Sequence, residues 1–88
     1  MTYEFAYSNK FKNHYKKLST AEKKQITNKL VLLSKDPSHP SLRTKRIQGT
    51  DRLFESSANM DVRIIWYYEG STLIALVNVG HHDILNQF

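Results

Sequence analysis

Two adjacent histidines lie near the end of the chain, in the stretch GHHD at residues 80–83. Histidine is the side chain whose proton moves near neutral pH, so His81 and His82 are candidates for general acid–base catalysis. Neighbouring side chains on an extended backbone point in opposite directions, and we expect at most one of the pair in a given site. The other histidines, His14 and His39, lie in the other half of the chain without metal-type spacing. The pattern therefore favours acid–base chemistry, or a solvated turn, over a metal site.

A single arginine interrupts the most strand-like segment, VRIIWYY at residues 62–68. A charge inside a central strand needs either a partner carboxylate or an anion bound in a groove. Glu55 and Asp61 are the carboxylates that fit the first case. The planar fork of arginine is well suited to a phosphate, which is the second case. Arg63 is thus a candidate ligand for a phosphate, with a structural ion pair as the alternative.

A second basic group, Arg43-Thr44-Lys45-Arg46, lies before that segment in the sequence, and Arg52 lies between the two. On an edge strand such charges would only discourage aggregation. If the group lies beside Arg63 and the histidines, the charges converge on one site. The net charge of +5 and the pI near 9.6 favour a polyanionic partner such as nucleic acid.

Two helices are expected in the first half of the chain, over residues 8–18 and 20–35. They follow a short strand at residues 3–7, where aromatic residues alternate with smaller or charged ones. The sequence Ser19-Thr20-Ala21-Glu22 fits a capping box at the start of the second helix. Asp36-Pro37 ends that helix, because the residue before proline is pushed out of helical geometry.

The second half of the chain predicts strands. The last of them is apolar at nearly every position, which is typical of an interior strand that is covered on both faces. The order is strand, helix, helix, then three or four strands, and it predicts an α+β fold. In this fold both helices cover one face of a small twisted, mainly antiparallel sheet, and the other face is left for a further role. The expected strands are residues 42–48, 52–57, 62–68 and 72–79.

Length and composition set the remaining expectations. With 88 residues the chain is expected to form one domain over residues 1–88, and without cysteine it has no disulfides. Neither a signal peptide nor a membrane span is apparent, so a cytoplasmic protein is expected. The residues expected to be largely buried are Leu30, Leu33, Ile64, Trp66, Ile74 and Leu76.

Taken in order, the helical pair, LRTKRIQG and DVRIIWYYEGSTLIALVNVGHHDIL resemble the RelE/ParE toxin superfamily of bacterial toxin–antitoxin modules. The likeness covers essentially the whole chain and is strongest to the RelE and YafQ-type ribonuclease branch. Its most specific part is the last strand followed by Gly-x-His and an aspartate. The resemblance implies an endoribonuclease that cuts messenger RNA, usually on the ribosome. It also implies that the enzyme needs no metal or cofactor and is neutralised by a cognate antitoxin.

The resemblance also implies roles for individual residues. His82 matches the terminal catalytic histidine, which Asp83 or the chain end would orient, and Arg63 matches the strand arginine that holds the scissile phosphate. Lys45 lies where YafQ-like members carry a histidine, so the identity of the general base stays open. A second histidine of the family, in the strand before Arg63, has no obvious match here, and Glu55 is a possible substitute for it. The other expected site residues are His81, as a weaker catalytic candidate, and the substrate-binding residues Arg43, Arg46 and Arg52.

Two other functions remain open at this point. A ParE-like toxin would inhibit DNA gyrase without cutting RNA, although the Gly-x-His-Asp ending favours the ribonuclease branch. A non-catalytic RNA-binding or protein-binding domain is the other alternative. The order of elements fits neither a double-stranded-RNA-binding domain nor an RNA-recognition motif, and the aromatic motif of the latter is missing.

Overall fold

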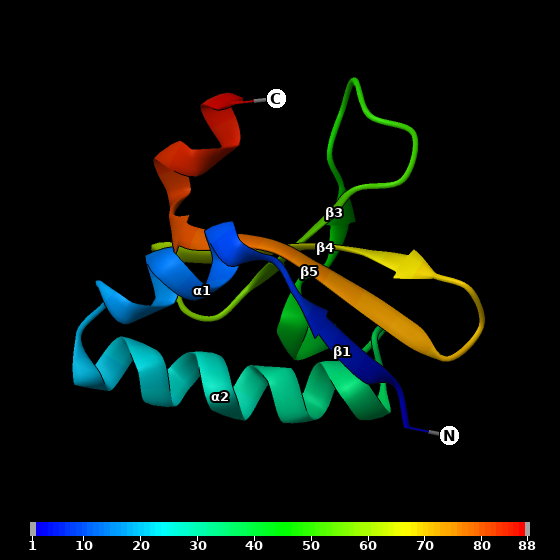
Figure 1. The fold of residues 1–88 in the computed structure, drawn as a ribbon, viewed down its shortest axis with the longest axis horizontal. Helices are drawn as coiled ribbons and strands as arrows, with labels where there is room; N and C mark the ends of the chain where they lie inside the picture. The colour runs from blue at the N-terminus through cyan, green and yellow to red at the C-terminus, as the bar shows by residue number, and fades with distance from the viewer. Residues whose placement is uncertain (1, 88) are drawn as a thin grey trace.

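The computed structural model describes residues 2–87, and its helices and strands follow the predicted order (Figure 1). No helix in this part of the chain is long and apolar enough to cross a membrane. The elements are β1 (Glu4–Tyr7), α1 (Asn9–Lys16), α2 (Thr20–Lys35), the 3-10 helix η1 (Pro40–Leu42), β2 (Lys45–Arg46), β3 (Phe54–Ser57), β4 (Val62–Glu69), β5 (Leu73–His81) and the 3-10 helix η2 (His82–Gln87).

Serine side chains cap both α-helices. The Ser8 hydroxyl accepts a hydrogen bond from the Phe11 backbone N–H at 3.0 Å and donates one to the Val77 carbonyl at 2.7 Å, so it also ties α1 to β5. At α2, Ser19 and Glu22 form the predicted capping box, in which each side chain accepts from the backbone N–H of the other residue. The two helix starts are therefore encoded locally, as the sequence predicts.

The strands form one mixed sheet in the order β1-β5-β4-β3-β2. β1 runs parallel to β5, and the other neighbouring strands are antiparallel. The interior position predicted for β5 is confirmed, since it lies between β1 and β4. In Figure 1, α2 lies below the sheet, whereas η2 and the loop between β2 and β3 rise from the opposite side.

The main core lies between the sheet and the helices. Trp66 is at its centre, stacked on Phe54, and its indole N–H donates to the buried Ser56 hydroxyl at 2.8 Å. Five of the six predicted core residues are buried. Leu30 is the exception, because it is only partly buried and lines an open groove beside β1. The buried members of the core are Phe11, Ile26, Leu33, Leu42, Ala58, Val62, Ile64, Trp66, Ile74, Leu76 and Val79.

The two leucines of α2 should differ in their contribution to stability. Leu33 is fully buried, so Leu33→Ala is expected to lower the free energy of unfolding by about 2–5 kcal/mol. Leu30→Ala removes a side chain that is already partly solvated and should cost clearly less. Urea unfolding followed by circular dichroism measures both values, and equal costs would contradict the observed helix register.

The segment between α2 and β3 differs from the prediction. A strand was expected over residues 42–48, but only Lys45–Arg46 pairs with a neighbour. Pro40 instead begins a 3-10 helix, where its fixed φ is favourable, and this helix buries Leu42 completely in the core. Arg43 then takes a left-handed conformation with φ of 49° and lies outside any strand. Arg43 therefore does not share a strand face with Lys45.

The sheet face away from the helices is not entirely free. A second apolar cluster covers part of it, with Ile47 from the β2–β3 loop, Ile65 from β4 and Ile84 from η2. Partly buried side chains surround this cluster, namely Leu53, Val77 and Leu85. The prediction that this face is left uncovered thus needs a correction, because the chain folds its own last turn over one part of it. The polar residues described next lie on the same face.

Candidate functional site

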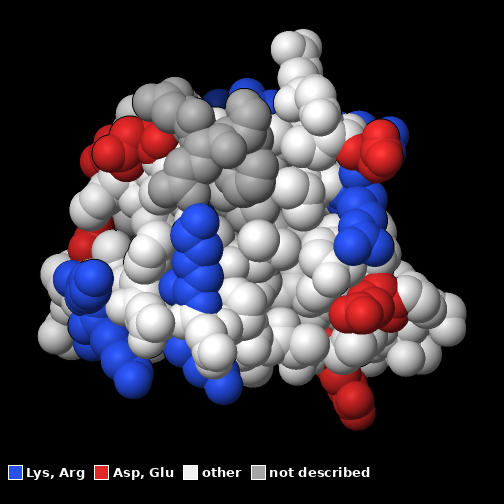
Figure 2. Space-filling model, turned by 45° about the horizontal axis from the view of Figure 1, so that its top comes forward, with Lys and Arg blue, Asp and Glu red and all other residues white. Residues whose placement is uncertain are grey.

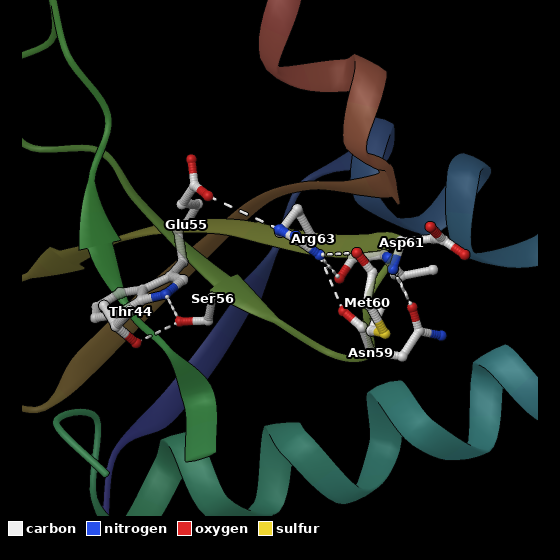
Figure 3. A network of polar contacts seen from close by, with 9 residues as sticks. Thr44, Glu55, Ser56, Asn59, Met60, Asp61 and Arg63 are labelled. Carbon is white, nitrogen blue, oxygen red and sulfur yellow. Dashed lines mark hydrogen bonds and ion pairs between the residues drawn. The ribbon is translucent and has the colours of Figure 1, made fainter. Parts of the chain in front are cut away.

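Lys45, Glu55 and Arg63 come from three neighbouring strands and lie on one face of the sheet. Lys45 of β2 pairs directly with Glu55 of β3, and Glu55 pairs with Ile65 of β4. Cross-strand partners share a face, and so do alternate residues of one strand. Arg63 is two residues from Ile65, so it also lies on the face opposite the helices. Figure 3 shows Glu55 and Arg63 side by side above β4, with α2 on the far side.

The Arg63 guanidinium is held at the turn before β4. Its Nη1 donates to the carbonyls of Asn59 at 2.9 Å, Met60 at 3.0 Å and Val62 at 3.2 Å. Its Nε lies 3.8 Å from Glu55 Oε1, so the carboxylate partner anticipated for a purely structural role is present (Figure 3). The side chain keeps 16% of its surface exposed. Arg63 is thus a pre-oriented cation that also stabilises its own turn.

Glu55 is the most buried residue of this group. Its side chain is only 9% exposed, its Oε1 lies 3.8 Å from Arg63 Nε, and its register partner on the other neighbouring strand is Lys45. A buried carboxylate requires such cations, because an unpaired charge is costly to remove from water. The group as a whole combines one proton acceptor with two basic residues on one sheet face.

The two histidines belong to different elements. His81 pairs with Val62 across β4, and its side chain therefore lies on the face that the helices cover. There its Nε2 lies 2.8 Å from Glu22 Oε2. His82 begins η2 and is exposed.

Gly80 is a point at which β5 and η2 approach each other closely. It lies inside β5, one residue before the end of the strand. A side chain there would meet η2, because a Cβ atom built on Gly80 would lie 2.8 Å from Ile84 Cγ2. The missing side chain lets η2 pack closely on the end of β5.

The remaining arginines of the predicted site make local contacts. Arg46 donates to the Asp51 carbonyl, and the Arg52 guanidinium lies 4.1 Å from the centre of the Tyr67 ring. Arg43 is exposed at the end of η1. Figure 2 shows lysine and arginine side chains in separate groups with uncharged surface between them, and acidic side chains at the upper left and on the right. On the face in that view, positive charge is therefore distributed and does not form one continuous patch.

Two hollows lie away from Arg63. A groove of about 900 Å³ runs along β1, α1 and α2 and is lined mainly by aromatic and aliphatic side chains, with Lys12 and Lys16 among them. A smaller hollow of about 240 Å³ adjoins His81 and is also lined by His14 and Asp83. Within residues 2–87, no three histidine, aspartate or glutamate side chains gather as a metal site. The chain end at Phe88, a candidate for orienting His82, lies outside the described residues.

The pKa of Glu22 is lower than that of an ordinary glutamate. The largest cause is the backbone hydrogen bond from Ser19, followed by the side-chain hydrogen bond to His81. A carboxylate with a lowered pKa stabilises the fold at pH values above its unfolded pKa, and this contribution disappears as the pH falls through the folded pKa.

A difference in melting temperature between the wild type and Glu22→Gln should therefore be present at pH 7. It should shrink below pH ~4.5, where the unfolded-state carboxylate begins to protonate, and vanish when Glu22 is protonated in the folded state. Thermal unfolding of both proteins between pH 7 and pH 3 measures this. A difference that stays constant across this range would mean that the Glu22 charge does not contribute.

Comparison with solved structures identifies the fold of the chain, whereas comparison by sequence finds no match. No protein-family model and no curated protein matches the sequence. Solved structures do match: RelE in the archaeal RelE–RelB complex from Pyrococcus horikoshii has 16% identity and a TM-score of 0.76 over 92% of this chain and 96% of its own. YafQ from E. coli has 16% identity and a TM-score of 0.77 over 94% and 97%. A YoeB/ParE toxin from Agrobacterium tumefaciens has 10% identity and a TM-score of 0.78 over 90% and 98%. The chain has the RelE-like toxin fold.

Proposed function

We propose that the chain is the toxin of a type II toxin–antitoxin pair and acts in the cytoplasm as an endoribonuclease that cuts messenger RNA, on the ribosome, without a metal ion. The observation that carries the proposal is the row of Lys45, Glu55 and Arg63 on one sheet face, in a RelE-like fold whose β5 leads directly to His82. The structural likeness supports the toxin class, and the row supplies groups for phosphate chemistry.

The proposed reaction uses the 2′-hydroxyl of the RNA as the nucleophile. A base removes its proton, the 2′-oxygen attacks the neighbouring phosphorus, and the bond from phosphorus to the 5′-oxygen breaks. Arg63 stabilises the extra negative charge of the phosphorane, and His82 donates a proton to the leaving 5′-oxygen. The products are a 2′,3′-cyclic phosphate and a free 5′-hydroxyl. Substrate-binding roles are proposed for Arg43, Arg46 and Arg52, which would contact the RNA backbone.

Glu55 is the better candidate for the base, and Lys45 for charge stabilisation. A lysine becomes a base when it is desolvated, whereas Lys45 is exposed and is paired in register with a carboxylate. Glu55→Gln is therefore expected to lower the cleavage rate by about 10²–10⁴-fold. Lys45→Gln should lower it by a smaller factor. Single-turnover cleavage of a ribosome-bound message by both variants decides between the residues, and the reverse order would assign the base to Lys45.

The proposed partner is an antitoxin with an acidic, partly apolar segment. The aromatic groove beside β1 supports this, since Tyr7 and Val31 expose about half of their surfaces there and Lys12 and Lys16 lie among the lining residues. The groove lies apart from Arg63, so inhibition would need a second contact of the antitoxin with the row of Lys45, Glu55 and Arg63. Co-purification with a short acidic protein from the same operon is the expected result. Normal growth on strong expression of the chain alone would contradict the toxin role.

The test of the proposed function combines growth with RNA analysis. Induction of the wild-type chain is expected to arrest growth and to create new 5′ ends within messenger RNA, which sequencing of 5′ ends maps. Growth arrest without new 5′ ends, accompanied by loss of DNA supercoiling, would favour gyrase inhibition. RNA binding without growth arrest or cleavage would favour a non-catalytic domain.

A further inference from the structure

A contact between Glu22 and His81 joins the start of α2 to the end of β5, although the two residues are 59 positions apart. One oxygen of the carboxylate, Oε1, accepts the Ser19 backbone N–H at 2.9 Å as part of the capping box. The other, Oε2, lies 2.8 Å from Nε2 of His81. The helix cap thus orients the carboxylate that meets the imidazole.

This contact fixes the residue immediately before His82. His81 is the last residue of β5 and faces the helix side together with its partner Val62. His82 follows as the first residue of η2, which packs through Ile84 on the sheet face away from the helices. Two residues further on, Ile84 packs against Gly80. His82 therefore lies between two anchors, the Glu22–His81 contact before it and the apolar contact after it.

We propose that Glu22 is a positioning residue for His82: through His81 it fixes the end of β5 so that the His82 imidazole is presented on the sheet face that carries Glu55 and Arg63. The effect on cleavage rests on the proposed ribonuclease function, whereas the effect on the order of the chain does not. The lowered pKa of Glu22 is consistent with this, because the carboxylate stays charged at neutral pH.

Because both side chains are open to water, we expect their contact to orient the start of η2 and to contribute little to stability. The His81 side chain is 58% exposed and the Glu22 side chain 22%. Polar contacts that are this open to water contribute little to the free energy of unfolding. Loss of the contact should therefore disturb η2 while the melting temperature changes little. The two effects can be measured separately.

Three variants of the full chain test the inference. Glu22→Gln can keep the capping box, because glutamine also serves at this position, but it loses the charge. His81→Ala removes the partner and leaves the cap untouched. Ser19→Ala is the matched control, since it weakens the cap through its lost hydroxyl but keeps the backbone N–H that holds Glu22. Backbone NMR relaxation over residues 81–85 reports local order, and single-turnover and steady-state cleavage separate kcat from KM.

The first two variants are expected to lower the order parameters of residues 82–85 from about 0.85 toward 0.6. They should also lower kcat by roughly 10–10²-fold with KM unchanged, because His82 is displaced from the reacting phosphate. The double variant should be no worse than His81→Ala alone, since both changes act on one contact. Ser19→Ala should lower the melting temperature by about 4–8 °C while order and kcat stay at wild-type values.

The inference is overturned if His81→Ala or Glu22→Gln leaves both the order of residues 82–85 and kcat unchanged. It is also overturned if Glu22→Gln has its full effect in the His81→Ala background, or if Ser19→Ala lowers kcat equally. Failure of the proposed function looks different, because the wild-type chain would then cleave no RNA. In that case the NMR comparison, which needs no activity, still decides whether Glu22 holds the end of β5.

Discussion

His82→Ala is expected to lower the rate of messenger RNA cleavage by about 10²–10⁴-fold, the usual effect of removing a general acid. The leaving 5′-oxygen would depart as an alkoxide if no proton were supplied. The side chain is exposed at the start of η2, so the substitution should change the free energy of unfolding by no more than about 0.5 kcal/mol. The measurement is growth arrest on induction, together with single-turnover cleavage of a ribosome-bound message.

Two comparisons make the His82 result specific. His39→Ala removes a histidine from the cap of η1, where its Nδ1 accepts from the Ser41 N–H, and should leave the cleavage rate unchanged. A substrate with a better leaving group than the 5′-alkoxide should restore much of the rate of His82→Ala, since it no longer needs the proton. Full toxicity of His82→Ala would mean that the two histidines have no catalytic role and only form part of a turn. This result would favour the gyrase alternative.

Local signals in the sequence were sufficient for most of the fold. The capping box at Ser19 and Glu22 fixed the start of α2, and the β-branched and aromatic run from Val62 identified β4. The segment around Leu42 was misassigned because a short apolar and basic stretch has no periodicity that separates a strand from a 3-10 helix. Its burial is decided by tertiary packing against the core, which no local pattern reports.

The candidate site was only partly accessible from the sequence for a similar reason. His82 and Arg63 were identifiable because each interrupts or ends a regular pattern. Glu55 gained importance only from its cross-strand neighbours, which depend on the register of β2, β3 and β4. The Glu22–His81 contact joins two distant segments, and in the sequence Glu22 was already explained by its role in the helix cap. Because the capping box already accounts for a glutamate at position 22, nothing in the sequence indicates that Glu22 also contacts His81.

Arg63→Ala is expected to lower the cleavage rate by about 10²–10³-fold, the usual loss when one electrostatic contact to a transition state is removed. It should also lower the free energy of unfolding by about 1–3 kcal/mol. The second effect follows because the turn carbonyls of Asn59 and Met60 lose their donor and the buried Glu55 carboxylate loses its cation. A loss of toxicity alone would therefore not separate catalysis from folding.

Arg63→Lys provides the separation. Lysine keeps a positive charge beside Glu55, so most of the stability should return, but it lacks the planar fork that holds the turn and a phosphate together. We expect its melting temperature to lie closer to wild type than that of Arg63→Ala, while its cleavage rate stays low. Lys24→Ala, which removes an exposed charge on α2, serves as the control for net charge. If Arg63→Lys instead recovers stability and cleavage in parallel, Arg63 acts only by holding the turn and Glu55. Another cation, such as Lys45, must then hold the phosphate.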